Sequence, residues 1–125
     1  MTTTLTTLAK KSVDTPDEVR EVPGGRIDIV RVADLEFARS VFQPGWSWSG
    51  SVKPLAGTES CEYPHRVFVA SGAVRVRMDD GTEIDAVAGD VLAVPPGHDG
   101  WVLGDEPCVM YDFGGEDADY ATPAT

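Results

Sequence analysis

The chain has 125 residues but only two cysteines and two histidines, and one of each lies in a single short stretch. In ESCEYPHRVFVASG, from Glu59 to Gly72, Cys61 precedes His65 by four residues. The other histidine, His98, lies in PPGHDGW, again beside proline and ahead of apolar residues. Thiolate and imidazole are soft and borderline ligands, and a mixed set of them favours zinc, with iron, copper or nickel as alternatives. The three side chains either converge on such a site or are unrelated strand residues.

Each of these residues also has a purely structural interpretation. A free cysteine is among the most buried residue types and behaves as a small apolar side chain, so Cys61 taken alone is more often a core residue. A single histidine beside a strand is also more often a hydrogen-bonded core residue than a ligand. Cys61 and Cys108 could instead oxidise to a disulfide, which a reducing cytosol disfavours.

Length and charge limit the classes of protein to which the chain can belong. A chain of 125 residues is the size of one domain and can bury a core without disulfides. Its formal net charge of −11 opposes binding to nucleic acid and to anionic membranes. No apolar run reaches the ~18 residues of a transmembrane helix, and MTTTLTTLAKKS lacks the pattern of a secretory signal. We therefore expect a cytoplasmic protein that binds neither nucleic acid nor membrane.

From Arg26 onward the pattern is one of short strands and turns. Many short segments rich in β-branched and aromatic residues, separated by Gly, Pro or Asp, are typical of a β-sandwich or barrel. The predicted strands are RIDIVRV, EFARSVF, HRVFVASG, AVRVRM, TEIDAVAGD, VLAVPPG and PCVMYDFGG.

The residues before Arg26 carry a different pattern. In DTPDEVREVPGG, Thr15 matches a helix N-cap, Pro16 the first helical position and Glu18 a capping box. The pattern predicts one or two helical turns, ended by the Pro-Gly-Gly that follows. The chain is thus expected to divide into a flexible N-terminal segment, a single domain and a flexible acidic tail, at residues 1–13, 14–115 and 116–125.

The hairpin AVRVRMDDGTEIDAV can be read in register. A two-residue Asp80-Gly81 turn would pair Val76 with Asp85, an apolar side chain with an acid. A three-residue loop with Gly81 in the left-handed conformation instead satisfies both faces of the hairpin. We predict this second register, with the charged pairs facing away from the core. Its apolar face pairs Val74 with Ala86, Val76 with Ile84 and Met78 with Thr82, and its charged face pairs Arg75 with Asp85 and Arg77 with Glu83.

Two spacings in the chain resemble the motifs of the cupin superfamily. The first cupin motif ends in a Gly that follows its Glu after six residues, and six residues separate His65 from Gly72. The second motif is a Gly, five residues and Pro-x-Gly, which GDVLAVPPG matches from Gly89 to Gly97. The resemblance covers roughly residues 45–113. It implies an all-β cupin barrel, a double-stranded β-helix or jelly roll.

The resemblance also implies where metal ligands lie, although the chain departs from the usual set of three histidines and one glutamate. Counted back from the end of the first motif, His65 occupies the glutamate position, and Glu59 and Cys61 occupy the two histidine positions. The closing histidine position falls on Gly100, and His98 stands two residues earlier with the same strand parity. The predicted ligands of a divalent transition metal, with zinc favoured, are therefore Glu59, Cys61, His65 and His98.

The resemblance leaves the activity open. We expect a small organic ligand at the mouth of the barrel, where Trp48, Tyr63 and Trp101 are predicted to line a pocket. Asp99 either orients His98 or caps its turn. The enzymatic hypothesis is metal-assisted oxygenase, isomerase or lyase chemistry on a small acid or polyketide-like substrate. The alternatives are a non-catalytic binding or sensing module, and a metal-free barrel that uses a histidine for acid–base work or packing.

The strands RIDIVRV and EFARSVF are expected to lie at sheet edges, where unpaired backbone groups are usually covered. Small cupins often cover such edges by dimerising, so we predict a homodimer. The large negative charge opposes this association, most strongly at low salt.

Overall fold

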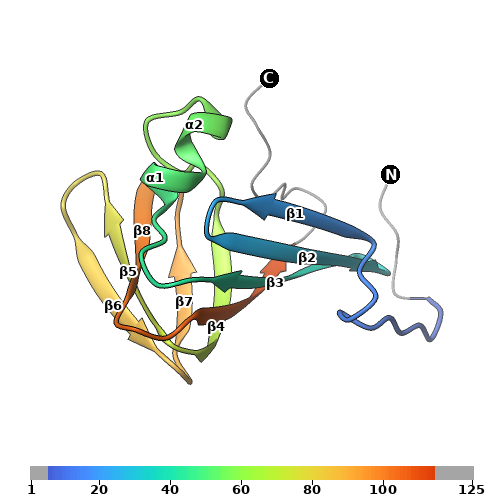
Figure 1. Ribbon diagram of the computed structural model, residues 1–125. Coiled ribbons are helices and arrows are strands. Elements are labelled where there is room, and N and C mark those ends of the chain that lie inside the picture. Colours follow the sequence, from blue (N-terminus) through green and yellow to red (C-terminus); the bar gives the residue numbers. More distant parts are fainter. Residues whose placement is uncertain (1–5, 115–125) are drawn as a thin grey trace.

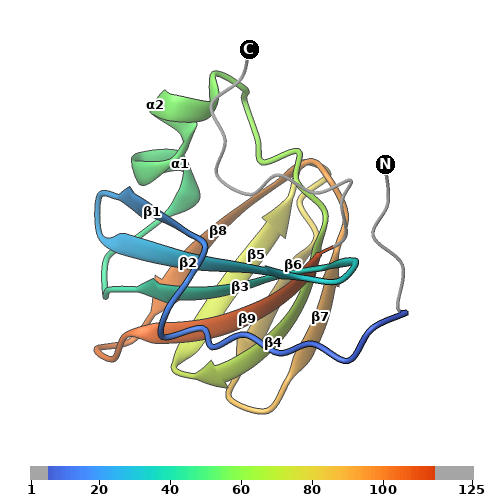
Figure 2. The ribbon, with the colours of Figure 1, turned by 90° about the vertical axis from the view of Figure 1, so that its right-hand side faces the viewer.

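The structure, a computed structural model, describes residues 6–114 and folds them into two antiparallel sheets (Figures 1 and 2). Its strands are β1 (Glu18–Val22), β2 (Gly25–Val32), β3 (Leu35–Phe42), β4 (His65–Ser71), β5 (Ala73–Met78), β6 (Glu83–Val87), β7 (Val91–Val94), β8 (His98–Leu103) and β9 (Cys108–Gly114). The larger sheet has the order β1-β2-β3-β9-β4-β7, and the smaller sheet has the order β6-β5-β8. Figure 2 shows the smaller sheet behind the larger one, so that the two enclose a barrel interior.

Alternate residues of the strands fill this interior. In β8 every second residue from His98 to Val102 is buried, and in β3 the same holds from Ala38 to Phe42. Because successive side chains of a strand point to opposite faces, each run turns one face of its strand inward. The largest fully buried side chains are Phe42, Ile27, Ile29, Val69, Cys108 and Ser40.

The predicted register of the β5–β6 hairpin is confirmed. Arg75 pairs with Asp85 and Arg77 with Glu83, and the Arg75 guanidinium donates through its Nη2 to Asp85 Oδ2 at 2.8 Å. Gly81 has a φ of 93°, the left-handed conformation that the three-residue loop requires. Ile84 lies opposite Val76, which lines the barrel interior, as predicted. Ile84 is nevertheless 55% exposed, because β6 is the edge strand of the smaller sheet.

The predicted helix near residue 16 is wrong, and strand β1 forms there instead. Val22 pairs with Gly25 across the Pro23-Gly24 turn, in which Gly24 has a φ of 75°. Proline followed by a glycine of positive φ forms a two-residue reverse turn. A helix of one or two turns is marginal on its own, and the ladder with β2 offers this segment more hydrogen bonds.

Two short helices that were not predicted follow the tryptophan-rich loop, α1 (Trp48–Ser51) and α2 (Lys53–Ala56). The Ser47 hydroxyl caps α1 by accepting from the Gly50 amide at 3.0 Å, and Gly57 ends α2 with a φ of 75°. Both capping residues are visible in the sequence, but helices of four residues leave no periodic pattern to detect. Neither helix is long enough to cross a bilayer.

The prediction that β2 and β3 are edge strands is also wrong. β1 covers β2 on one side, and β9 pairs with β3 on the other. Residues 6–13 are described and contain neither helix nor strand. The predicted acidic tail, residues 116–125, lies outside the described part of the chain, as do residues 1–5.

Candidate metal centre

Cys61, His65 and His98 lie together at one end of the barrel interior. One donor atom from each of the three side chains lies within 4.8 Å of the other two. Cys61 Sγ is 3.8 Å from His65 Nε2, and the two imidazole rings meet edge to face with their centroids 5.0 Å apart. All three residues are buried from solvent: Cys61 is 5% exposed, His98 is 4% exposed, and the His65 side chain is 11% exposed.

Different elements bring these three residues together. His65 is the first residue of β4 and His98 is the first residue of β8, so each histidine sits at the same end of a different sheet. Cys61 lies in the loop before β4 and forms an isolated bridge with His98. In that bridge the Cys61 amide donates to the His98 carbonyl at 2.7 Å, and the His98 amide donates back at 3.2 Å. The backbone thus fixes the cysteine directly beside the second histidine.

Each histidine of this cluster has its Nδ1 engaged by an acceptor. His65 Nδ1 lies 2.6 Å from Asp112 Oδ2, and His98 Nδ1 lies 2.8 Å from the Pro95 carbonyl oxygen. A carbonyl oxygen only accepts, so His98 carries its proton on Nδ1 and presents Nε2 as a free lone pair. In the ring of His65, the Asp112 carboxylate at Nδ1 leaves Nε2 directed toward Cys61 Sγ. This pairing of a ligand histidine with a carboxylate or carbonyl recurs at metal sites, because it fixes the tautomer and the ring orientation.

Burial controls the ionisation of two members of the cluster. It raises the pKa of the Cys61 thiol to about 11, although the Tyr63 amide donates to the sulfur and partly offsets this effect. Burial, followed by the proximity of His65, lowers the pKa of His98. At neutral pH the cluster therefore contains a protonated thiol and an uncharged His98 imidazole. A metal ion would have to displace the thiol proton, which cation binding to a cysteine generally does.

The donor atoms fit a transition metal. For a tetrahedral zinc site with Zn–S of ~2.3 Å and Zn–N of ~2.0–2.1 Å, sulfur and nitrogen ligands lie ~3.6 Å apart. The 3.8 Å between Cys61 Sγ and His65 Nε2 is close to this separation. One thiolate and two imidazoles are a ligand set suited to zinc.

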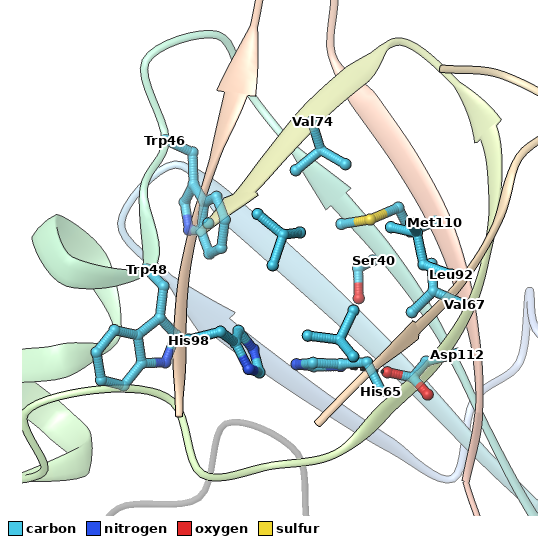
Figure 3. A pocket seen from close by; sticks show the side chains of 13 residues that line it. Ser40, Trp46, Trp48, His65, Val67, Val74, Leu92, His98, Met110 and Asp112 are labelled. Atoms are coloured by element: carbon cyan, nitrogen blue, oxygen red, sulfur yellow. Dashed lines mark hydrogen bonds and ion pairs between the residues drawn. The ribbon is translucent and has the colours of Figure 1, made fainter. Parts of the chain in front are cut away.

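A cavity of about 50 Å³ adjoins the cluster (Figure 3). His65 and His98 form part of its wall, and Figure 3 shows their rings facing each other there. The rest of the wall is mostly apolar, and none of the residues that line it is a lysine or arginine. The lining residues are Ser40, Trp46, Trp48, His65, Val67, Val74, Val76, Leu92, Val94, His98, Gly100, Met110 and Asp112.

The structure does not bring Glu59 into this cluster. Its side chain is 93% exposed and lies 2.8 Å from Lys53 Nζ. The prediction assumed an extended strand from residue 59 to residue 65, whereas these residues form a loop that ends only at Pro64, so the alternation of side chains is lost. Glu59 is therefore not part of the cluster of Cys61, His65 and His98.

Of the three predicted pocket residues, only Trp48 lines the cavity. Tyr63 packs against His65 with ring centroids 4.8 Å apart but is not part of the cavity wall. Trp101 lies between the buried Gly100 and Val102 in β8, so its side chain lies on the outer face of the strand.

Asp99 does not orient His98. Its Oδ1 accepts from the amides of Gly100 and Ser49, at 2.8 and 3.1 Å, and so ties β8 to the start of α1.

Two polar residues of the site, Asp112 and Ser40, were not predicted from the sequence. Asp112 is 2% exposed and Ser40 is 1% exposed, and both line the cavity. Asp112 is the single polar residue on the inward parity of β9, and Ser40 lies between the apolar Ala38 and Phe42 on the inward parity of β3. A polar residue among inward-facing apolar residues could have indicated a site residue. This signal can be used only when the inward face of each strand is known.

The sequence matches no known protein-family profile and no curated protein. Among solved structures, the fold is similar to a sugar phosphate isomerase of the cupin superfamily from Silicibacter pomeroyi, with a TM-score of 0.62 and 20% identity over 86% of this chain and 76% of that one. The polyketide cyclase RemF from Streptomyces resistomycificus has a TM-score of 0.59 and 16% identity, over 86% and 78% of the two chains. A cupin-like protein from Thermotoga maritima has a TM-score of 0.53 and 17% identity, over 74% and 68%. The fold is therefore that of a small cupin, as the two motif spacings predicted.

Proposed function

We propose that the barrel binds a divalent transition metal through Cys61, His65 and His98, together with a small organic ligand in the adjoining cavity. The observation that carries this proposal is the convergence of three donor atoms within 4.8 Å, with a hydrogen-bond acceptor already at Nδ1 of each histidine. Zinc is the metal that this ligand set favours, and iron, nickel and copper are the alternatives.

With three protein ligands, a bound metal keeps an open coordination position and supplies Lewis-acid chemistry to a ligand atom there. The chain's own residues prepare that position. Asp112 fixes the ring of His65, the Pro95 carbonyl fixes the ring of His98, and mostly apolar side chains line the adjoining cavity. A low-dielectric wall strengthens every polar contact made inside it.

The enzymatic form of the proposal is metal-assisted isomerase, oxygenase or lyase chemistry, and its non-catalytic form is a binding or sensing module. Two structural neighbours are named as an isomerase and a cyclase, which supports the first of these classes. A sugar phosphate is a poor ligand for this cavity, because no lysine or arginine lines it to bind a phosphate. The small volume of the cavity, about 50 Å³, also favours a ligand smaller than a polyketide.

A metal-free acid–base site is a second candidate, since Cys61, His65 and Asp112 follow one another in the order of a thiol, an imidazole and a carboxylate. The separations are 3.8 Å between Sγ and Nε2 and 2.6 Å between Nδ1 and Oδ2. The pKa of Cys61, raised to about 11 by burial, argues against a thiolate nucleophile in this arrangement.

The test is elemental analysis of untagged protein after equilibration with zinc, iron and nickel salts. We expect one metal ion per chain in the wild type and none in His65→Ala, because that change removes a ligand. Circular dichroism should show the same β-sheet content in both proteins. Stoichiometric metal in His65→Ala would contradict the site, and a metal-free wild type would favour the acid–base candidate.

A further inference from the structure

Ser40 is the exception among the buried polar residues of the described structure. It lies on the inward face of β3, beside Met110 of β9, and is only 1% exposed. No hydrogen bond to its hydroxyl is found among residues 6–114. The other buried polar side chains all have partners. These residues are Asp28, Ser51, Ser60, His98 and Asp112.

The cavity wall holds two polar groups that have no protein partner in the described part of the chain. The Ser40 hydroxyl faces the cavity, where a ligand or water can reach it. Trp46, whose indole N–H also has no partner among the described residues, lines the same cavity. Two polar groups without protein partners on one cavity wall indicate a ligand that supplies the partners.

Figure 3 shows the Ser40 hydroxyl pointing into the cavity, on the side away from the backbone of β3 and toward the space bounded by His65 and His98. The wall between the serine and the histidines is apolar, with Val67 and Leu92 among its residues. A ligand that fills the cavity can thus reach the metal cluster with one end and Ser40 with the other.

Size and metal chemistry define the chemical class of this ligand. The cavity of about 50 Å³ has room for a ligand of only a few heavy atoms beside the cluster. A divalent ion held by the three side chains would keep an open position for an oxygen donor, and a carboxylate is such a donor. We propose that Ser40 binds the distal polar group of a short hydroxy- or oxo-carboxylate whose carboxylate lies at the metal. The proposal rests on the metal site described above.

The experiment compares two probes of equal size, 3-hydroxypropanoate and butanoate, which differ only in a hydroxyl against a methyl group. Both are titrated by calorimetry into zinc-loaded wild type, Ser40→Ala and Ser51→Ala, after elemental analysis of each protein. We expect the wild type to bind 3-hydroxypropanoate about 10-fold more tightly than butanoate. Ser40→Ala should bind both probes equally, through the loss of affinity for 3-hydroxypropanoate alone.

Ser51→Ala is the matched control, because Ser51 is a buried serine whose hydroxyl donates to the Pro23 carbonyl at 2.6 Å. It should keep the 10-fold preference and unfold about 4 °C lower than the wild type. Ligand-free Ser40→Ala should unfold close to the wild-type temperature, since it loses no hydrogen bond to the protein.

Three results would overturn the role of Ser40 while leaving the metal site in place. They are equal affinity of the two probes for metal-loaded wild type, no binding of either probe, and a lower unfolding temperature of ligand-free Ser40→Ala. A wild type that takes up no metal would instead overturn the proposed function, and with it the carboxylate end of this proposal.

Discussion

Among single residues, Asp112 has the clearest predicted effect on metal binding. Its Oδ2 holds His65 Nδ1 at 2.6 Å, so the carboxylate both orients the ring and makes Nε2 a better electron donor. Asp112→Asn keeps the shape of the side chain but removes its charge. We expect the zinc affinity to fall about 10–100-fold, while the stoichiometry at saturating zinc stays at one. Competition with a chromophoric chelator measures this change.

Asp85→Asn is the control for that variant, because Asp85 pairs with Arg75 on the exposed face of the β5–β6 hairpin. It removes the same charge without touching the cluster, so its zinc affinity should match that of the wild type. Wild-type affinity in Asp112→Asn would show that the carboxylate has no influence on the metal.

The residues of the site differ in how far the sequence could predict them. Cys61 and His65 were predicted from the spacing of the first motif. His98 was predicted because it stands two residues before the histidine position of the second motif, with the same strand parity. Glu59 was misplaced because the prediction assumed strand alternation in what is a loop. Asp112 could not be linked to His65, because 47 residues separate them and only the pairing of β4 with β9 brings them together.

At the scale of the elements, the sequence predicted what local patterns determine. Seven of the strands from Arg26 to Gly114 were predicted to within three residues, because alternation and turn glycines are local signals. β8 was not among the predicted strands. The order of strands in the larger sheet was not predictable, since β3 pairs with β9 across most of the domain. The segment of β1 was predicted as a helix because it carries local helix-capping signals. Its pairing with β2, which stabilises the strand, was not considered.

The turn between β4 and β5 depends on the absence of a side chain at Gly72. This residue has a φ of 79°, and a Cβ there would run into the carbonyl oxygen of Pro107 and the backbone of Cys108. Gly72→Ala therefore has to move backbone as well as adopt a strained φ. We expect it to lower the free energy of unfolding by about 3 kcal/mol or more, as measured by urea denaturation.

Gly81→Ala separates these two effects. Gly81 also has a positive φ, of 93°, but a Cβ at this position meets no atom within 4 Å. Only the cost of the left-handed conformation remains, about 1 kcal/mol. Equal losses of stability in the two variants would show that the Pro107 contact does not constrain the turn.

At the scale of the whole molecule, the outer face of the larger sheet carries an exposed apolar patch. It consists of Phe68, Val91 and Phe113, on the neighbouring strands β4, β7 and β9, with exposures of 37%, 77% and 46%. Exposed apolar surface of this kind is typical of interaction sites. We propose that a second copy of the chain covers it, which gives the predicted homodimer a basis other than strand edges. Two chains of charge −11 repel each other, so the dimer should strengthen as salt increases.

Val91→Lys should convert the dimer to a monomer in sedimentation at micromolar concentration and moderate salt. A lysine lowers the net negative charge, so repulsion alone would favour the dimer, and its loss would report the apolar contact. Val87→Lys is the control, because Val87 is 55% exposed on β6, away from the patch. A monomeric wild type, or equal dissociation of both variants, would contradict this interface.

The location of the cluster also has a mechanical consequence. His65 belongs to the larger sheet and His98 to the smaller one, and no backbone ladder joins the two sheets among the described strands. An ion bound by both histidines would cross-link the two sheets at this end of the barrel, through bonds of ~2 Å. Chelation would then loosen that end alone. The amides of Cys61 and His98 would exchange faster with solvent, while the ladder between β2 and β3 would keep its protection.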